Sequence, residues 1–274
     1  MRIVGFLQNF QGANNGYLRQ CLRSMSACTD HIVVYDDAST EDVRPIYEEF
    51  GCTVIYGLRN EFHRELYHKQ QLLYVALTYK PTWILWFDSD AILGRQFETR
   101  ESTEATLNSC DEQGIVLLHL HNLNLWRSNR SYRVDNSFND LWHGVWWRNT
   151  GELHYVPVAR LHQKQYPQFW LDHDAPVINS KFPGETGKLI HLGFSTDEDI
   201  AAKYFKYREN GQTGWALDRL VTEDDKLDLQ VVPDEWFPQW YLDEHAAVPY
   251  PGPRFTPEDM AKHGSLQEWQ RVVR

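Results

Sequence analysis

The sequence predicts an α/β fold in which helices flank a mostly parallel β-sheet. Two observations lead to this prediction. Across residues 1–90, short apolar segments alternate with amphipathic segments, which is the pattern of strand–helix–strand units. The apolar segments lack a regular polar alternation, as expected for strands buried on both faces of a sheet. Sheets of this kind bind ligands at the carboxyl ends of their strands.

The elements of this region can be placed in order along the chain. The expected strands are RIVGFLQNF (2–10), HIVVYDDAS (31–39), CTVIYGL (52–58) and TWILWF (82–87). The expected helices are GYLRQCLRSMSAC (16–28), TEDVRPIYEEFG (40–51) and ELYHKQQLLYVALTYK (65–80). The second helix carries start and stop signals, because Thr40 can cap it, acids fill its first turn and Gly51 ends it.

Beyond residue 95 the pattern is weaker. GIVLLHLHNLNLW (114–126) is a strand candidate, and residues 126–190 are rich in loops and aromatic side chains. STDEDIAAKYFKYRENG (195–211) predicts a helix with Ser195 or Thr196 as its cap and with acids in its first turn. The proline-rich residues 231–257 are expected to wrap the surface before a last helix at TPEDMAK, with Pro257 at its first position.

Composition limits the class of protein. With 274 residues the chain can bury a large core, and it needs neither disulfides nor metal to fold. A net charge of -11 argues against a general nucleic-acid or anionic-membrane binding protein. The cysteines form no CxxC pair, which predicts free thiols in a reducing compartment. Because we find neither a signal-peptide pattern nor an apolar run of about 18 residues, we expect a soluble, cytoplasmic protein.

The most informative stretch is PTWILWFDSDAIL (81–93), an apolar run that ends in Asp88 and Asp90. Residues i and i+2 of a strand project to the same side, so we expect both carboxylates to aim at one point beyond the strand. Magnesium and manganese bind one or two carboxylates together with substrate phosphates. The stretch therefore predicts a metal–diphosphate site, and the alternative is a pair of exposed acids on a turn.

The order of these parts resembles the GT-A fold of nucleotide-sugar glycosyltransferases, in particular that of family 2-like enzymes. The matching pieces are RIVGFLQNF, HIVVYDDASTEDV, CTVIYGLRNE, HKQQLLYVAL and PTWILWFDSDAIL, and VVYDDAST together with WILWFDSDAIL is the specific combination. The second half matches loosely, mainly in KLIHLGFS. The resemblance implies a Rossmann-like GT-A domain with a donor-binding half (1–95), an aromatic-rich acceptor-binding half (96–230) and a C-terminal extension (231–274).

The resemblance also implies which residues bind the nucleotide-sugar donor, expected to be a UDP-sugar. These residues are Leu7, Gln8, Asn9, Asp36, Asp37, Arg64, Lys69, Asp88 and Ser89. The first three would line the nucleotide pocket, and Asp37 or its neighbour Asp36 would contact the base or ribose. Helix capping is the alternative for this acidic pair. Arg64 and Lys69 would lie near the diphosphate, and a solvated helix face is the alternative for them.

The implied metal ligands for Mn²⁺ or Mg²⁺ are Asp88, Asp90 and His191, for which a structural histidine is the alternative. The metal would neutralise the diphosphate leaving group. An inverting enzyme also needs a base for the acceptor hydroxyl, and the candidates are Asp135 and Asp140, with His143 close by. The usual acidic pair of the family is not recognisable in this region, so the base and the stereochemistry stay open.

The segment LWRSNRSYRVDNSFNDLWHGVWWRN (125–149) interleaves aromatic residues with arginines in the expected acceptor half. Such rings stack on sugars or bases, and the alternative is that they form core with arginine stems packed over them. A glycan, a lipid-linked sugar or a hydroxymethylated pyrimidine in DNA would each fit as the acceptor.

Other interpretations are weaker. His119 and His121 share a strand face and are able to bind a metal, although such residues more often face a polar loop. A haloacid-dehalogenase phosphatase would carry its DxD in the first strand, a nucleotidyltransferase would need a basic glycine-rich loop, and a methyltransferase would need a glycine loop after the first strand. A glycan-binding module without catalysis is the non-enzymatic alternative, and retention of both Asp88 and Asp90 argues against it.

Overall fold

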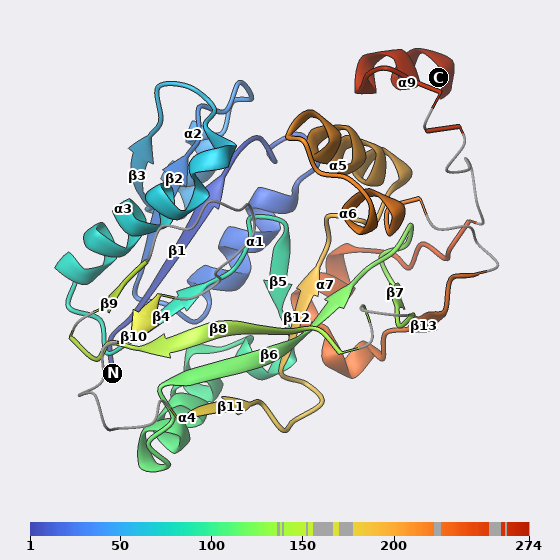
Figure 1. Cartoon of the computed structure of the whole chain (residues 1–274). Coiled ribbons are helices and arrows are strands. Elements are labelled where there is room, and N and C mark those ends of the chain that lie inside the picture. Colours follow the sequence, from blue (N-terminus) through green and yellow to red (C-terminus); the bar gives the residue numbers. More distant parts are fainter. Residues whose placement is uncertain are drawn as a thin grey trace. The chain divides into compact units, whose positions relative to one another are not determined.

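The structure is a computed structural model of the chain, and it divides into two compact units. It describes residues 1–135, 138, 140–151, 153–155, 167–169, 178–221, 226–251, 259–260 and 262–273. Unit 1 comprises Met1–Asn122, Trp142–Ile190 and Asp234–Leu242, and unit 2 comprises Leu123–Leu141, His191–Pro233 and Asp243–Arg274. We describe each unit by itself (Figure 1).

A large sheet forms the centre of unit 1, and its strand order among the described residues is β3-β2-β1-β4-β8-β6-β12-β5, with β11 also paired to β6 (Figure 1). The strands are β1 (Ile3–Asn9), β2 (His31–Asp36), β3 (Thr53–Tyr56), β4 (Trp83–Trp86), β5 (Ala91–Leu93), β6 (Leu117–Asn124), β8 (Trp142–Arg148), β11 (Asn179–Lys181) and β12 (Lys188–His191). The first four strands in this order run parallel, and β8 runs antiparallel to β4 and β6. The predicted α/β fold with a mostly parallel sheet is confirmed.

The helices of unit 1 follow the predicted order. They are α1 (Tyr17–Ser26), α2 (Arg44–Glu49), α3 (Glu65–Thr78) and α4 (Arg100–Glu112), with short 3-10 turns η1 (Phe62–Arg64), η2 (Arg95–Phe97) and η5 (Asp234–Trp236). A short helix α7 (Gln239–Glu244) begins in unit 1, and β9 (Leu153–His154) pairs with β10 (Gln168–Phe169).

The predicted start of α2 is wrong. The helix begins at Arg44 without a side-chain cap, and Pro45 occupies its first turn. Thr40 is instead held by Gln11, whose Oε1 accepts from Thr40 N at 3.2 Å and whose Nε2 donates to Thr40 Oγ1 at 2.9 Å. The polar residues before the helix therefore order a loop, and proline supplies the fixed backbone angle that starts the helix.

Among the elements of unit 1 that were not predicted from the sequence are α4 and β8. The helix α4 buries only Thr103, Leu107 and Cys110, so its apolar stripe is too thin for a clear periodic signal. The strand β8 was expected to be loop. It lies between β4 and β6, and Trp146 and Trp147 are both fully buried because successive side chains point to opposite faces.

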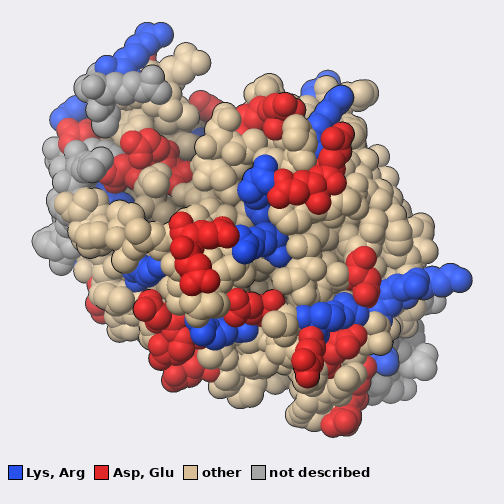
Figure 2. Space-filling view, turned by 180° about the vertical axis from the view of Figure 1, so that it is seen from behind, with Lys and Arg blue, Asp and Glu red and all other residues tan. Residues whose placement is uncertain are grey.

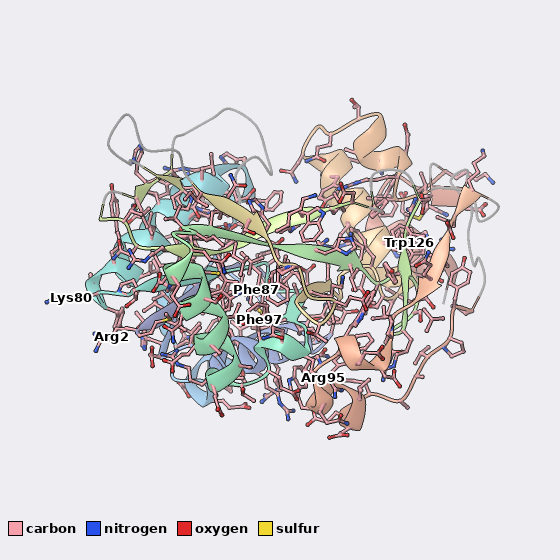
Figure 3. All side chains as sticks on the ribbon, turned by 90° about the horizontal axis from the view of Figure 1, so that it is seen from below. Arg2, Lys80, Phe87, Arg95, Phe97 and Trp126 are labelled. Carbon is pink, nitrogen blue, oxygen red and sulfur yellow. The ribbon has the colours of Figure 1, made fainter. Side chains whose placement is uncertain are left out.

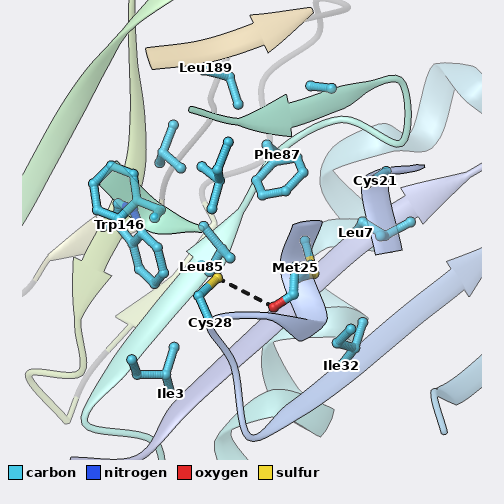
Figure 4. Close-up of a cluster of buried hydrophobic side chains, with 14 of the residues drawn as sticks. Ile3, Leu7, Cys21, Met25, Cys28, Ile32, Leu85, Phe87, Trp146 and Leu189 are labelled. Atoms are coloured by element: carbon cyan, nitrogen blue, oxygen red, sulfur yellow. Dashed lines mark hydrogen bonds between the residues drawn. The ribbon is translucent and has the colours of Figure 1, made fainter. Parts of the chain in front are cut away.

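The core of unit 1 lies on both faces of the sheet. One cluster contains Ile3, Val34 and Leu85, and the other contains their neighbours Val4, Val33 and Ile84. Figure 4 shows part of the first cluster, in which Cys28 Sγ donates to Met25 O at 3.3 Å. In Figure 3, Phe87 and Phe97 lie in the interior, whereas Arg2 and Lys80 extend from the surface.

The structure confirms two further predictions, one about the cysteines and one about the helix at residues 195–211. All four cysteines are free thiols, and three of them are buried. The helix predicted at 195–211 is α5 (Asp197–Glu209) of unit 2, and Thr196 caps it by accepting from Asp199 N at 3.1 Å. Gly211 follows it with a φ of 75°, a left-handed angle that glycine adopts without strain.

Unit 2 packs α5 with α6 (Trp215–Asp218), α9 (Leu266–Val273) and an antiparallel pair, β7 (Ser131–Arg133) with β13 (Leu229–Val231). Its core includes Trp126, Phe205 and Trp269. A buried ion pair joins Arg127 Nε to Asp197 Oδ1 at 2.8 Å. Most of the helix predicted at TPEDMAK, with Pro257, lies outside the described residues.

The two units interleave along the chain, whereas the predicted halves 1–95, 96–230 and 231–274 are continuous, so the functional division stays a prediction. None of the helices in the described ranges is both long and apolar enough to cross a membrane. On the face that Figure 2 shows, acidic and basic side chains of the described residues are interspersed and form no broad basic surface.

Gly94 allows the turn after β5 to approach its neighbours closely. A Cβ built there would lie 2.5 Å from Thr186 O and 2.9 Å from Trp236 O. We therefore expect Gly94→Ala to lower the free energy of unfolding by about 1–3 kcal/mol, because backbone atoms must move to admit a methyl group. Urea denaturation measures this loss.

Gly211→Ala is the matched control. Nothing lies within 4 Å of a Cβ at Gly211, and its φ is +75°, so only the cost of a left-handed backbone angle, about 1 kcal/mol, is expected. An equal or smaller loss in Gly94→Ala would contradict the close approach.

Candidate active site

The predicted donor-site residues follow strands whose carboxyl ends meet at one edge of the sheet. The pairing of β1 with β2 puts Asn9 opposite Asp36. The pairing of β1 with β4 puts Phe6 opposite Trp86, so Gln8 and Asp88 each lie two residues beyond that pair. The register of parallel strands therefore brings together residues that are far apart in sequence.

The two acids of the DxD lie on a turn after β4. The strand ends at Trp86, and Ala91 N donates to Asp88 O at 3.1 Å before β5 begins. The expectation that strand alternation aligns the two carboxylates is therefore wrong, because neither acid is in a strand. Asp88 is exposed, and Ser89 and Asp90 are half-buried.

The buried thiol of Cys21 lies beside the turn that carries the two carboxylates. Cys21 of α1 donates from Sγ to Asp88 O at 3.6 Å. Burial raises the pKa of the Cys21 thiol, and the charges of Asp90 and Asp88 raise that pKa further. Because electrostatic interactions weaken with distance, both acids lie near this side of α1.

The carboxylate oxygens of Asp88 and Asp90 suit a divalent metal that binds together with the diphosphate of a substrate. Magnesium-type sites use one or two carboxylates and complete their shell with substrate phosphates and water. Within the described part of the chain, no three His, Cys, Asp or Glu side chains gather as a metal site. Asp88 and Asp90 fit the two-carboxylate pattern.

The third predicted metal ligand, His191, ends β12 and belongs to unit 2. Its Nε2 lies 3.2 Å from Lys203 Nζ, and its ring centroid lies 4.8 Å from that of Phe194. These contacts fit the structural alternative, and a role for His191 in a metal shell stays a prediction.

Asp36 fixes the loop that follows β2. Its Oδ2 accepts from Tyr47 Oη at 2.6 Å, and its Oδ1 accepts from Ser39 N at 2.8 Å. Asn9 Nδ2 donates to the same Tyr47 Oη at 2.8 Å. Asn9, Tyr47 and Asp36 therefore form a buried chain of hydrogen bonds that joins the ends of β1 and β2 to α2.

Asp37 fixes a second loop. It is fully buried, and it accepts from Glu61 N at 2.9 Å and from Asn60 Nδ2 at 3.1 Å. Its own N–H donates to Asn9 O at 2.8 Å. The two acids thus hold the loops at the strand ends, and contact of either with a base or ribose stays a prediction.

A further link between loops was not found from the sequence. Glu41 Oε2 accepts from Ala13 N at 2.7 Å and from Asn14 N at 3.1 Å. Gln11 N donates to Ser39 Oγ at 2.8 Å, and Gln11 Oε1 accepts from Glu41 N at 3.0 Å. These bonds fasten the loop after β1 to the loop after β2.

His68 was also missed. Its Nδ1 lies 2.9 Å from Gln8 Nε2, and its ring stacks on Tyr35 with centroids 4.1 Å apart. The imidazole is fully buried, and burial lowers the pKa of His68 to about 4. A neutral histidine therefore supports the Gln8 side chain at the end of β1. Its partners lie 60 and 33 positions away, so local sequence carries no signal for the arrangement.

The remaining predicted donor residues have local partners. The Leu7 side chain is fully buried in the core. Lys69 is buried, with its Nζ 2.5 Å from Glu65 Oε1 and 4.1 Å from the Trp86 ring centroid. Arg64 is partly exposed and lies 3.2 Å from Glu61. Proximity of Arg64 or Lys69 to a diphosphate stays a prediction.

The two candidate bases, both in unit 2, differ in environment. Asp135 is buried and forms a two-point ion pair with Arg133, at 2.8 Å from Nε and 2.5 Å from Nη2. Asp140 is exposed on a turn. His143 lies in β8 of unit 1.

Most rings of the aromatic segment form core, as in the alternative considered from sequence: Trp126, Tyr132, Trp146 and Trp147 are buried. Its arginines also have partners within the protein. Arg127 pairs with Asp197, Arg130 donates to His245 O, and Arg148 pairs with Asp111. A DNA acceptor is therefore not supported, because these charges serve the fold and only Trp142 among the tryptophans of the segment is half-exposed.

No protein-family model and no curated protein matches the chain. Solved structures do match. TarS from S. aureus with UDP-GlcNAc is 20% identical over 46% of this chain and 34% of the TarS chain, with a TM-score of 0.34. The chain thus spans about a third of that protein.

Two further matches also contain nucleotide sugars. Mannosyltransferase PcManGT from Pyrobaculum calidifontis with GDP-Man and Mn²⁺ is 9% identical over 80% of this chain and 67% of that one, with a TM-score of 0.44. Glucosyl-3-phosphoglycerate synthase from Mycobacterium tuberculosis with Mn²⁺ and UDP-glucose is 16% identical over 45% and 43%, with a TM-score of 0.29. All three TM-scores are below 0.5, so the function is argued from the chain's own residues.

His68 predicts a pH dependence of stability. Its pKa of about 4 lies below the value of about 6.5 for an unfolded histidine, so between these values the unfolded chain binds the extra proton. The free energy of unfolding should therefore fall as pH drops from 6.5 to 4, with about 2–3 kcal/mol due to His68.

Urea denaturation across this pH range checks the prediction. His68→Gln should remove this part of the loss, whereas His63→Gln, an exposed neighbour on η1, should keep it. Identical pH profiles for wild type and His68→Gln would show that the imidazole is not held neutral.

Proposed function

We propose that the protein is a metal-dependent glycosyltransferase that moves a sugar from a nucleotide sugar, a UDP-sugar by the sequence resemblance, to a hydroxyl of a glycan or lipid-linked sugar. The observation that carries the proposal is the position of Asp88 and Asp90. They lie on a turn at the carboxyl edge of a parallel sheet, level with Gln8 at the end of β1. Ligand sites in open α/β sheets occupy this edge.

The chain's own residues would prepare this edge for the donor. The chain from Asn9 through Tyr47 to Asp36 and the bonds from Glu41 to Ala13 and Asn14 fix the loops before any ligand binds. A preordered site costs less conformational entropy on binding.

Asp90 and Asp88 would hold Mn²⁺ or Mg²⁺, with His191 as the third proposed ligand. When bound, such a metal offsets negative charge on the diphosphate leaving group. The two carboxylates would also orient the donor through that shared ion, and Asp88, as the exposed member, would face the ribose.

For an inverting reaction, Asp140 is the better candidate for the base that takes the proton of the acceptor hydroxyl. A carboxylate held at two points by an arginine has both oxygens engaged and is less available to an acceptor hydroxyl. Asp135 is held in this way by Arg133, whereas Asp140 is exposed.

The experiment that tests the function is release of free nucleotide from a panel of nucleotide sugars with Mn²⁺, with and without glycan acceptors. We expect slow release from one donor, with water replacing the acceptor. Binding of a glycan together with no donor turnover under any condition would favour a non-catalytic glycan-binding module.

Asp90→Asn should abolish the Mn²⁺-dependent part of donor binding, a loss of at least about 100-fold, because a neutral amide is a poor ligand for a hard cation. Calorimetric titration of UDP with and without Mn²⁺ measures this. Asp42→Asn removes an exposed carboxylate of the same unit and should leave binding unchanged. Full Mn²⁺-dependent binding of UDP by Asp90→Asn would contradict the proposal that Asp90 is a metal ligand.

Substitutions of the two candidate bases, Asp140 and Asp135, should change different properties of the protein. Asp140→Asn should lower the rate of transfer by 100-fold or more and leave stability near wild type. Asp135→Asn should lower the free energy of unfolding by about 3 kcal/mol, because Arg133 would remain buried without its counterion. Transfer rates and urea denaturation measure the two effects, and the reverse pattern would exchange the roles.

A further inference from the structure

Six side chains of unit 1 form a basic and aromatic cluster that the donor site does not use. We call it the basic aromatic patch, and its members are His119, His121, Trp142, Lys181, Lys188 and Trp236. Four contacts link five of them, and strand pairing adds His119. A cluster of positive charge is unusual in this chain, whose net charge is -11.

Strand pairing places most of the patch on one face of the sheet. His121 of β6 is opposite Trp142 of β8, and His119 of β6 is opposite Lys181 of β11. Directly paired residues project to the same side of a sheet. Leu120, between the two histidines, belongs to the core, so the patch lies on the other face.

Lys188 is the central charge of the patch. Its Nζ lies 3.4 Å from His121 Nδ1 and 4.3 Å from the centroid of the Trp236 ring. The residue is 8% exposed, and burial lowers the pKa of Lys188, while the nearby charge of Glu185 raises it. Among the described residues, no carboxylate lies within ion-pair distance of Lys188.

With no carboxylate of the described residues in ion-pair distance, the buried ammonium of Lys188 carries a desolvation cost that the charge of Glu185 offsets only in part. The ring face of Trp236 and the long contact to His121 recover only part of this cost. An anion bound beside Lys188 would recover the rest. This is the arrangement expected of a site whose counterion comes from a ligand.

Trp142 adds a half-buried aromatic ring to the patch, and a sugar would pack on the part of this ring that stays exposed. The ring stacks with that of His121 at 5.2 Å and 26°, and Lys181 Nζ lies 4.5 Å from its centroid. Indole faces combine a large apolar area with a polarised π system, which matches the C–H face of a sugar.

We propose that the basic aromatic patch is an acceptor subsite for a sugar that carries an anionic group, a phosphate or a carboxylate. Lys188 supplies the main charge, His121 a second polar contact and Trp142 the platform for an adjoining ring. The role of this ligand as acceptor rests on the proposed glycosyltransferase function, whereas the binding of an anion does not.

The backbone connects the patch to the turn that carries the donor-site acids. Gly94 N donates to Lys188 O at 2.8 Å, and Gly94 is four residues beyond Asp90. Four residues of extended chain span at most about 13 Å. Within this limit one acceptor would reach both places, with its reactive hydroxyl toward Asp90 and its charge toward Lys188.

Titration of the purified full chain with inorganic phosphate, and with glucose 6-phosphate against glucose, tests the inference. Wild type should bind both phosphate compounds and bind glucose at least tenfold more weakly. Lys188→Gln should weaken phosphate binding tenfold or more, and Lys188→Arg should retain it. Lys80→Gln, which removes a lysine on the surface of the same unit, should have no effect (Figure 3).

Thermal unfolding separates a ligand site from a structural lysine. In a buffer free of phosphate, Lys188→Gln should unfold at or above the wild-type temperature, because it removes an uncompensated charge. Phosphate should then raise the midpoint of wild type only. A lower midpoint for Lys188→Gln, or equal phosphate binding by both proteins, would overturn the inference.

Binding of UDP with Mn²⁺ distinguishes the two sources of phosphate. Lys188→Gln should bind UDP as wild type does, and a matching loss of UDP affinity would assign the anion to the donor and overturn the proposal. If no nucleotide sugar is turned over, the glycosyltransferase function fails, while the phosphate titration still decides whether the patch binds anions.

Discussion

The parallel pairing of β1 with β2 and β4 is the constraint on which the candidate site depends. It sets Asn9 opposite Asp36 and Gln8 level with Asp88, so that polar groups from three separate strands reach one edge. The strands are buried on both faces, so a shift of register by one residue would exchange the side chains that pack in the two core clusters. Core packing therefore fixes the register, and the register assembles the edge.

The sequence predicted this part of the fold well because its strands are short apolar runs separated by helices. The helix α4 was not predicted because it buries only a narrow stripe of side chains. The strand β8 was not predicted because the consecutive residues Trp146 and Trp147 are both buried, on opposite faces of the sheet. The DxD was found by its position after an apolar strand, but its geometry was misjudged. A turn closed by Asp88 and Ala91, rather than strand alternation, sets the direction of the acids.

Other parts of the site depend on pairs of residues that only the folded chain brings together. His68 contacts Gln8 and Tyr35, and Glu41 accepts hydrogen bonds from Ala13 N and Asn14 N. Local sequence cannot reveal such partners. The same holds for the arginines of the second half, where Arg127 forms an ion pair with Asp197 and Arg133 forms one with Asp135. The number of charged residues along the sequence therefore overstates how many charged side chains can contact a ligand. The burial of each side chain and its partners within the protein determine that number.

The proposed metal site is tested most directly by the position of manganese in crystals grown with UDP and Mn²⁺, located by anomalous diffraction. Binding of the metal by Asp90 predicts a single strong peak about 2 Å from a carboxylate oxygen of Asp90, with UDP at the ends of β1 and β2. The same map would show whether His191 is a ligand. A manganese peak away from Asp88 and Asp90, with UDP bound elsewhere on the chain, would contradict the proposed site.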